Sequence, residues 1–185
     1  MSDRRDAPRI GPASREELGP VNALLVRIAG RVAKTTAPPN LFTTIGRNRR
    51  MFRLWLLFAG TLMPRGGLPR RDTELVILRV SHRTGAEYEA VHHRPMGRAA
   101  GLSAEQIDAI AGDDPGAGPF SPRQLLLLRA VDELHDGDEI GEETFAALES
   151  ELSDRDIVEL CMLAGHYSML AGLINSLRIQ SDVHR

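Results

Sequence analysis

The chain is poor in several residues that mark common classes of protein. It has a single cysteine, Cys161, which excludes an internal disulfide framework and fits a reducing cytoplasm. Aromatic residues make up only 4% of the 185 residues, and the alternation of β-branched residues that is typical of strands is scarce. Charge of neither sign dominates, with 23 Lys plus Arg against 25 Asp plus Glu, so we expect no nucleic acid partner.

The chain also lacks an amino-terminal apolar core of the kind that directs secretion, because its first ten residues are mostly charged or polar. The expected location is therefore cytoplasmic. The segment 157–177 is long and apolar enough to suggest a membrane span, but Glu159, His166 and Asn175 fall within it. We expect a central helix of the fold and no membrane span.

Gly165 and Gly172 would let another backbone approach this helix closely, which favours a second subunit as its partner.

Ala, Leu, Arg and Glu dominate instead, and these residues favour helix. The expectation is an all-α, single-domain fold of about eight or nine helices. Residues 1–13 carry Pro8, Gly11 and Pro12 and are predicted to form a flexible N-terminal arm, with the domain in residues 14–185. Apolar spacing and capping patterns predict helices over 21–34, 41–48, 51–63, about 69–84, 87–100, a short one from 103, 121–136, 142–151 and 153–180. The apolar run 74–83 could also be a buried strand, but no other segment offers it a strand partner.

The segment GAEYEAVHH at 85–93 holds the most informative pattern in the chain. Glu89 and His93 are four residues apart, as are Tyr88 and His92, and residues at this spacing share one face of a helix. A carboxylate beside an imidazole is a minimal pair for proton transfer. Glu74 lies twelve residues before Ala86, at the head of the apolar run, which indicates burial. The candidate catalytic residues are therefore Glu74, Glu89 and His93.

Further candidates for substrate binding are Tyr88 and His92 on the same predicted helix, and His166 and Tyr167 within the last apolar helix. Each has an ordinary alternative as a buried side chain with a local partner. Arg79, Arg83 and Arg94 could hold a substrate carboxylate by paired hydrogen bonds, although solvated surface positions are the simpler interpretation.

A metal site has little support in the sequence. The chain has no cysteine cluster and no H-E-x-x-H pattern, and adjacent His92 and His93 would point about 100° apart on a helix. We therefore expect no metal and no organic cofactor. A metal bound jointly by His93, Glu89 and Glu74 is left open.

Residues 40–177 resemble the carboxymuconolactone decarboxylase family, whose superfamily also contains alkylhydroperoxidase D. The resemblance is carried by RRDTELVILR at 70–79, GAEYEAVHH at 85–93, AGLS at 100–103, RAVDELH at 129–135 and GHYSML at 165–170. It implies an all-α, alkylhydroperoxidase D-like helical bundle that assembles into trimers, hexamers or dimers. It also implies that Glu74 and His93 take the family's glutamate and histidine positions.

The peroxidase branch of this superfamily has a Cys-x-x-Cys pair where this chain has Ala86 and Glu89. Thiol peroxidases need a nucleophilic thiolate and a resolving thiol, so that chemistry does not transfer. The decarboxylase branch has a glutamate four residues before the histidine, as here. This implies a cofactor-free acid/base enzyme that decarboxylates or isomerises a small carboxylated or lactone-type metabolite. The alternatives are a non-catalytic ligand-binding or interaction module and an antioxidant role through Cys161, which the missing thiol pair disfavours.

Overall fold

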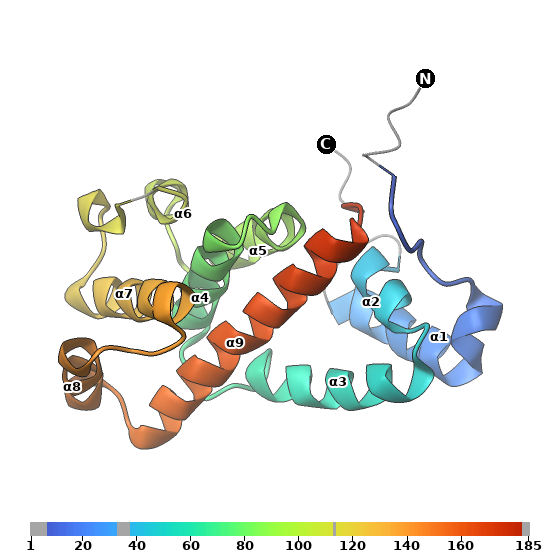
Figure 1. The fold of residues 1–185 in the computed structure, drawn as a ribbon, viewed down its shortest axis with the longest axis horizontal. Helices are drawn as coiled ribbons and strands as arrows, with labels where there is room; N and C mark the ends of the chain where they lie inside the picture. The colour runs from blue at the N-terminus through green and yellow to red at the C-terminus, as the bar shows by residue number, and fades with distance from the viewer. Residues whose placement is uncertain (1–6, 33–37, 113, 183–185) are drawn as a thin grey trace. The chain divides into compact units, whose positions relative to one another are not determined.

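A computed structural model describes residues 7–32, 38–112 and 114–182 of the chain (Figure 1). These residues form nine α-helices and one short 3-10 helix, η1 (Pro115–Ala117), and none of them lies in a strand. The all-α prediction is confirmed, and helix is the correct interpretation of the apolar run 74–83. The chain divides into two compact units, one comprising Met1–Gly60 and Leu173–Arg185 and the other Thr61–Gly172.

The first unit contains α1 (Arg15–Val32), α2 (Asn40–Ile45) and most of α3 (Arg49–Leu62). Ser14 caps α1 through a reciprocal pair of bonds with Glu17, as the capping pattern indicates. The helical backbone is interrupted at Gly19, where φ is 71° and Pro20 follows. The predicted flexible arm lies partly outside the described residues, at 1–6. In its described part the backbone N–H of Arg9 donates to the carbonyl of Leu177 at 2.9 Å.

The second unit contains the remaining elements and all the candidate catalytic residues. It comprises α4 (Arg70–Arg83), α5 (Glu87–Ala99), α6 (Ala104–Ile110), α7 (Pro122–Gly137), α8 (Glu142–Glu151) and most of α9 (Asp154–Leu177). Capping boxes at Ser103 and Ser121 start α6 and α7, as the sequence predicts.

Helix α4 is the centre of this unit and packs against α5, α6 and α7 (Figure 1). Every residue from Asp72 to Ser81 is buried, which explains why the run is apolar on nearly all sides. Gly85, at φ 63°, lets the chain reverse in a short turn, so that α5 returns along α4. Pro95 predicts a kink or break near Val91–His92, but α5 is a single helix from Glu87 to Ala99. A proline removes one backbone hydrogen bond, and packing along α4 is sufficient to keep the helix intact.

Arg79 is fully buried on α4 and fastens it to α7. Its guanidinium makes a two-pronged ion pair with Asp132, with both N···O distances 2.7 Å, and donates to the carbonyls of Ile110 and Gly112. Both interpretations of Arg79 from the sequence, substrate binding and surface solvation, are therefore wrong. A guanidinium whose donors are used in this way is a structural part of the core.

Helix α9 is fixed to the loop before α4 by one carboxylate. Glu159 accepts hydrogen bonds from the backbone N–H groups of Gly67 and Leu68, at 2.7 and 3.0 Å. Because this loop leads into α4, the contact sets the position of the α4 amino terminus against α9. By length and composition α9 could cross a membrane, and half of its most apolar window is buried within the chain. This is weak support for a span, because the core helix of a soluble protein passes the same test.

The buried ion pair generates a prediction about stability. Replacing Arg79 with Met leaves Asp132 without its strongest partner and two carbonyls without donors, so we expect the free energy of unfolding to fall by about 3 kcal/mol. Urea unfolding measures this change. Arg71→Met on the same helix, at an exposed position, is the matched control and is expected to change stability by less than about 0.5 kcal/mol. Equal stability of the two variants would contradict a structural role for Arg79.

Candidate active site

The structure brings Glu74, Glu89 and His93 into direct contact, and we refer to these three residues as the His93 cluster. Nδ1 of His93 lies 2.8 Å from Oε2 of Glu74, so its N–H donates a hydrogen bond to that carboxylate. Nε2, on the other side of the ring, lies 3.4 Å from Oε2 of Glu89. Two carboxylates therefore face the two nitrogens of one imidazole.

Helix geometry produces this arrangement from two segments distant in sequence. Glu89 and His93 share one face of α5, and that face packs on α4 at the turn that carries Glu74. Gly97, one turn beyond His93, lets the helices approach closely, because a Cβ there would lie 3.2 Å from a methyl group of Leu78 and 3.8 Å from Cβ of Glu74. The cluster is enclosed, with Glu74, Glu89 and His93 only 0%, 3% and 4% exposed.

The two carboxylates decide the protonation state of the imidazole. Burial by itself lowers the pKa of His93, because it penalises the charged form. Hydrogen bonds and charge interactions with Glu74 and Glu89 outweigh this effect and raise the pKa to about 9. At neutral pH, His93 is therefore an imidazolium between two acidic side chains, and it is prepared to donate a proton rather than to accept one.

Tyr167 and His166, on α9, lie beside the cluster. The ring of Tyr167 meets the ring of His93 edge-on at 5.2 Å, and His166 meets Tyr167 edge-on at 5.4 Å. Burial, together with the charges of Glu89 and Glu74, holds the pKa of the Tyr167 phenol well above its usual value, so the phenol stays protonated. Burial lowers the pKa of His166, against a smaller opposing effect of the Glu89 charge. His166 is therefore neutral at neutral pH.

Arg70 also belongs to the site, although it is not among the residues predicted from the sequence. Its Nη2 lies 2.5 Å from Oε1 of Glu74, one turn along α4, and its side chain is 38% exposed. Glu74 thus joins the buried imidazolium to a partly solvated guanidinium. The i,i+4 spacing of Arg70 and Glu74 is the signal that could have identified it.

Tyr88 and His92 are placed differently. Their rings stack on each other at 4.3 Å, and Nδ1 of His92 lies 2.7 Å from the carbonyl oxygen of Tyr88. On α5, His92 points about 100° away from His93. The pair therefore occupies another face of the helix, and a substrate-binding role for it stays a prediction.

The remaining candidates lie apart from the cluster. Arg83 pairs with Asp136 and approaches Asp132 at 3.6 Å, which ties it to α7. Arg94 is exposed on α5. Cys161 is half-buried, and burial raises the pKa of its thiol, which disfavours the reactive thiolate. Ala86, at the first cysteine position of the peroxidase pattern, is fully buried.

The arrangement around His93 is poorly suited to a metal ion. Among the residues that the structure describes, no group of three or more His, Cys, Asp or Glu side chains is arranged to hold one. The geometry gives the reason, because Glu74 and Glu89 contact opposite nitrogens of the ring. Their oxygens therefore do not converge with a histidine nitrogen on one point, as the ligands of a single ion must.

Comparisons with known proteins agree with this fold. Residues 49–133 match the model of the Carboxymuconolactone decarboxylase family, and the matched segment contains the whole His93 cluster. No curated protein sequence matches the chain.

Several solved structures share the fold at low sequence identity. A peroxidase-related protein from Ralstonia eutropha JMP134, described as an alkylhydroperoxidase AhpD core, has a TM-score of 0.80 at 20% identity, over 94% of this chain and 93% of its own. A peroxidase-related protein from Silicibacter sp. TM1040 has a TM-score of 0.79 at 18% identity, over 96% and 91%. The debrominase Bmp8, in complex with 2,3,4-tribromopyrrole, has a TM-score of 0.74 at 14% identity, over 94% and 91%. The predicted AhpD-like fold is confirmed.

The raised pKa of His93 predicts a dependence of stability on pH. Because the folded-state value of about 9 lies above the unfolded value of 6.5, the contribution is complete below pH 6.5 and is lost as pH rises through 9. We expect the free energy of unfolding to fall by up to about 3 kcal/mol across this interval. Urea unfolding at a series of pH values measures it.

The double variant Glu74→Gln/Glu89→Gln removes both charges that raise the value. Burial then dominates, so stability is expected to rise, not fall, as pH passes 6.5. His135→Asn, at an exposed histidine on α7, is the control and is expected to keep the wild-type slope. A wild-type curve that is flat between these pH values would contradict the protonated His93.

Proposed function

We propose that this chain, which belongs to the carboxymuconolactone decarboxylase (AhpD-like) superfamily, is a cofactor-free acid/base enzyme acting on a small carboxylated or lactone-type metabolite. The observation that carries the proposal is an imidazole held between two buried carboxylates. Buried groups that bias one another's protonation are typical of catalytic acids and bases.

The contacts support a different role for each member of the cluster. His93, protonated at neutral pH, is the proton donor. Glu89 is assigned the proton-accepting role, because Glu74 is already held by both His93 and Arg70. Glu74 accepts from Nδ1 of His93 and is itself held by Arg70, so these two act as positioning residues that keep Nε2 directed at Glu89 and the substrate.

In the proposed decarboxylation, the bond between a ring carbon and the substrate carboxylate breaks and carbon dioxide leaves. The electron pair of that bond enters the unsaturated ring, and a carbon of the ring takes a proton from Nε2 of His93. The imidazole then regains a proton from solvent. In an isomerisation, Glu89 removes a proton from one carbon and His93 delivers one to another. Neither reaction needs an oxidant or a reductant.

A substrate can reach this enclosed cluster only if a covering side chain moves. Tyr167 is the best candidate, because its ring packs edge-on against His93 and its hydroxyl contacts the Met63 sulfur at 3.7 Å, a weak hydrogen bond. Movement of this ring would open one side of the His93 imidazole. The same enclosure favours the alternative of a non-catalytic module, in which the three side chains only satisfy one another's hydrogen bonds in the core. The turnover assay below distinguishes this alternative from an enzyme.

The neighbours described as peroxidase-related bear on the antioxidant alternative. Their chemistry is not proposed for this chain, because Ala86 and Glu89 stand where that branch has cysteines. Burial also raises the pKa of the Cys161 thiol, which makes it a poor nucleophile.

We expect turnover of carboxymuconolactone, measured as carbon dioxide release and as incorporation of solvent deuterium into the product. His93→Asn and Glu89→Gln are each expected to lower kcat/KM at least about 100-fold, because each removes a group that moves a proton. His135→Asn and Glu149→Gln, on α7 and α8, are the matched controls. Turnover by His93→Asn at the wild-type rate, or none by the wild type on any of a panel of carboxylated lactones, would contradict the proposal.

The activity should also depend on pH in the direction that the pKa of His93 sets. The donor is protonated below about pH 9, so kcat/KM is expected to fall tenfold per pH unit above that value. A pH–rate profile of the wild type measures it. Full activity maintained well above pH 9 would exclude His93 as the acid.

The predicted homo-oligomer is also a proposal, and exposed apolar residues of α9 support it. Val158, Met162 and Met169 are 63%, 47% and 56% exposed, and their spacing puts them on one face of the helix. Gly165 and Gly172 lie on the same face, with open space where a Cβ would be. Such an apolar face, on a helix of which about half is buried within the chain, suits contact with a second copy of this chain.

Light scattering after size-exclusion chromatography tests this assembly. We expect the wild type to have the mass of a dimer or larger, and Met162→Glu/Met169→Glu to shift it toward a single chain. Phe145→Glu, at an exposed apolar position on α8, is the control and should keep the wild-type mass. A wild type with the mass of one chain would contradict the proposed interface.

A further inference from the structure

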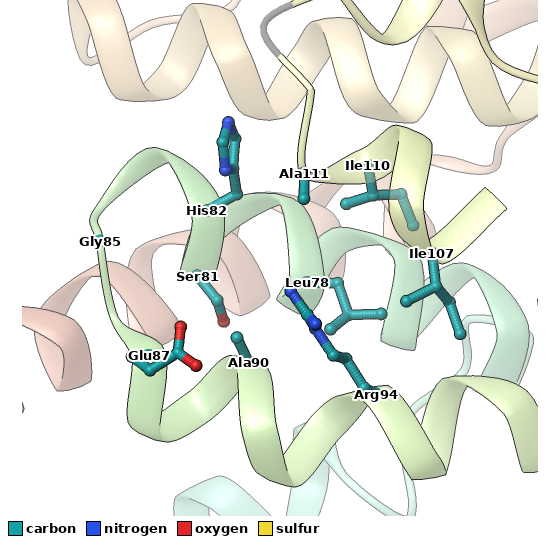
Figure 2. A pocket seen from close by; sticks show the side chains of 10 residues that line it. All are labelled: Leu78, Ser81, His82, Gly85, Glu87, Ala90, Arg94, Ile107, Ile110 and Ala111. Carbon is teal, nitrogen blue, oxygen red and sulfur yellow. The ribbon is translucent and has the colours of Figure 1, made fainter. Parts of the chain in front are cut away.

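A pocket of about 130 Å³ lies where α4, α5 and α6 meet, and none of the residues that line it belongs to the His93 cluster (Figure 2). Its lining includes the buried side chains of Leu78, Ile107 and Ile110. A ligand in this pocket would therefore contact these apolar groups and not the imidazole. The groups that could hold a ligand beside His93 are instead the donors that contact the cluster itself, and these belong to Arg70 and Tyr167.

Arg70 and Tyr167 each direct a hydrogen-bond donor at the sulfur of a methionine. Besides its contact with Glu74, Nη2 of Arg70 lies 3.7 Å from Sδ of Met96. The hydroxyl of Tyr167 lies 3.7 Å from Sδ of Met63. A thioether sulfur is a weak acceptor, whereas a carboxylate oxygen is a strong one, above all for a guanidinium. Each of these two N–H and O–H groups therefore lacks a strong acceptor that an anionic ligand would supply.

The guanidinium of Arg70 has further donors to offer. Its Nε and Nη1 make no hydrogen bond or ion pair with the residues that the structure describes, and its side chain is 38% exposed. Arg79 on the same helix differs, because it is buried and all three of its nitrogens donate to other groups of the core. Arg70 is thus held by Glu74 through one nitrogen, and the other two are available to a ligand that arrives from solvent.

Arg70 and Tyr167 approach the cluster from different helices and lie near each other. Arg70 on α4 shares the carboxylate of Glu74 with His93, and the ring of Tyr167 on α9 packs against the ring of His93. Burial and two carboxylates of the cluster raise the pKa of the Tyr167 phenol, and the positive charge of Arg70 opposes them. Such charge interactions weaken with distance, so the guanidinium is close enough to act on the phenol. A carboxylate bound by both groups would therefore lie beside the imidazole.

We propose that Arg70 and Tyr167 form a subsite for a carboxylate of the substrate, whose oxygens replace the two methionine sulfurs as acceptors. When the ring of Tyr167 moves away from His93, its hydroxyl exchanges the sulfur of Met63 for this carboxylate. The movement that opens the imidazole is thus also the movement that binds the ligand. A cation stabilises a carboxylate against loss as carbon dioxide, so the group held here is one that the product retains.

The inference rests on the proposed function for the nature of the ligand, but binding of an unreactive carboxylate tests it without turnover. The probe is 2-furoate, a five-membered ring with one carboxylate, added to protein labelled with ¹³C at tyrosine Cζ. The chain has only two tyrosines, Tyr88 and Tyr167, and Tyr167→Phe assigns their signals. We expect the Tyr167 signal to shift with a Kd of about 1 mM and the Tyr88 signal to stay in place. The neutral amide 2-furamide should bind at least tenfold more weakly.

Two variants test the two donors, with binding followed by amide chemical shifts of ¹⁵N-labelled protein. Arg70→Gln is expected to weaken binding of 2-furoate at least tenfold. Arg71→Gln removes the same charge from the exposed neighbour on α4, so it is the matched control and should bind as the wild type does. Tyr167→Phe keeps the ring and removes only the hydroxyl, and it is expected to weaken binding about fivefold.

Substitutions of Met63 test the exchange of acceptors. Met63→Gln supplies an amide oxygen that competes for the Tyr167 hydroxyl, so it should weaken binding, whereas Met63→Leu offers no acceptor and should bind at least as tightly as the wild type. The subsite is overturned if Arg70→Gln or 2-furamide binds as tightly as its reference, or if Tyr167 does not shift at 20 times the expected Kd. The expected binding in a protein that turns over no lactone would support the subsite and contradict only the proposed reaction.

Discussion

Two acidic side chains that are almost fully removed from water need a cation close to them, and the site is organised around that need. Glu74 and Glu89 are buried on facing helices, and the imidazole of His93 contacts both carboxylates. An isolated buried carboxylate is costly, so the arrangement is stable only if His93 carries a proton. The same proton on His93 therefore serves both structure and proposed chemistry. It gives the ring the positive charge that stabilises the two buried carboxylates, and it is the proton that the ring can donate.

The same rule applies along the whole of α4. Asp72 pairs with Arg123 on α7, Glu74 with Arg70 and His93, and Arg79 with Asp132. Each buried charge of this helix thus has a partner, and most of the partners lie on the helices packed around it. Ion pairs of this kind specify which neighbour belongs where, whereas apolar contacts alone would tolerate small shifts.

Much of this architecture could be predicted from the sequence, because its signals are local. Helix propensity, the capping boxes at Ser103 and Ser121 and the four-residue spacing of Glu89 and His93 each depend on neighbouring residues. The mistakes came from long-range contacts. Nothing next to Arg79 in sequence reveals that Asp132 lies beside it, and nothing near Pro95 shows that α4 supports the helix through it. The contact between the rings of Tyr167 and His93 likewise depends on the packing of α9 beside α5, which the spacing of residues in the sequence does not reveal.

The central claim is that His93 is a buried imidazolium at neutral pH, and NMR of its ring measures this directly. In protein labelled with ¹⁵N at histidine, both ring nitrogens of His93 should show the shifts of protonated nitrogens at pH 7 and should titrate with a pKa of about 9. Titration at or below the ordinary value of 6.5, or a neutral ring at pH 7, would contradict the account, because burial would then outweigh the two carboxylates.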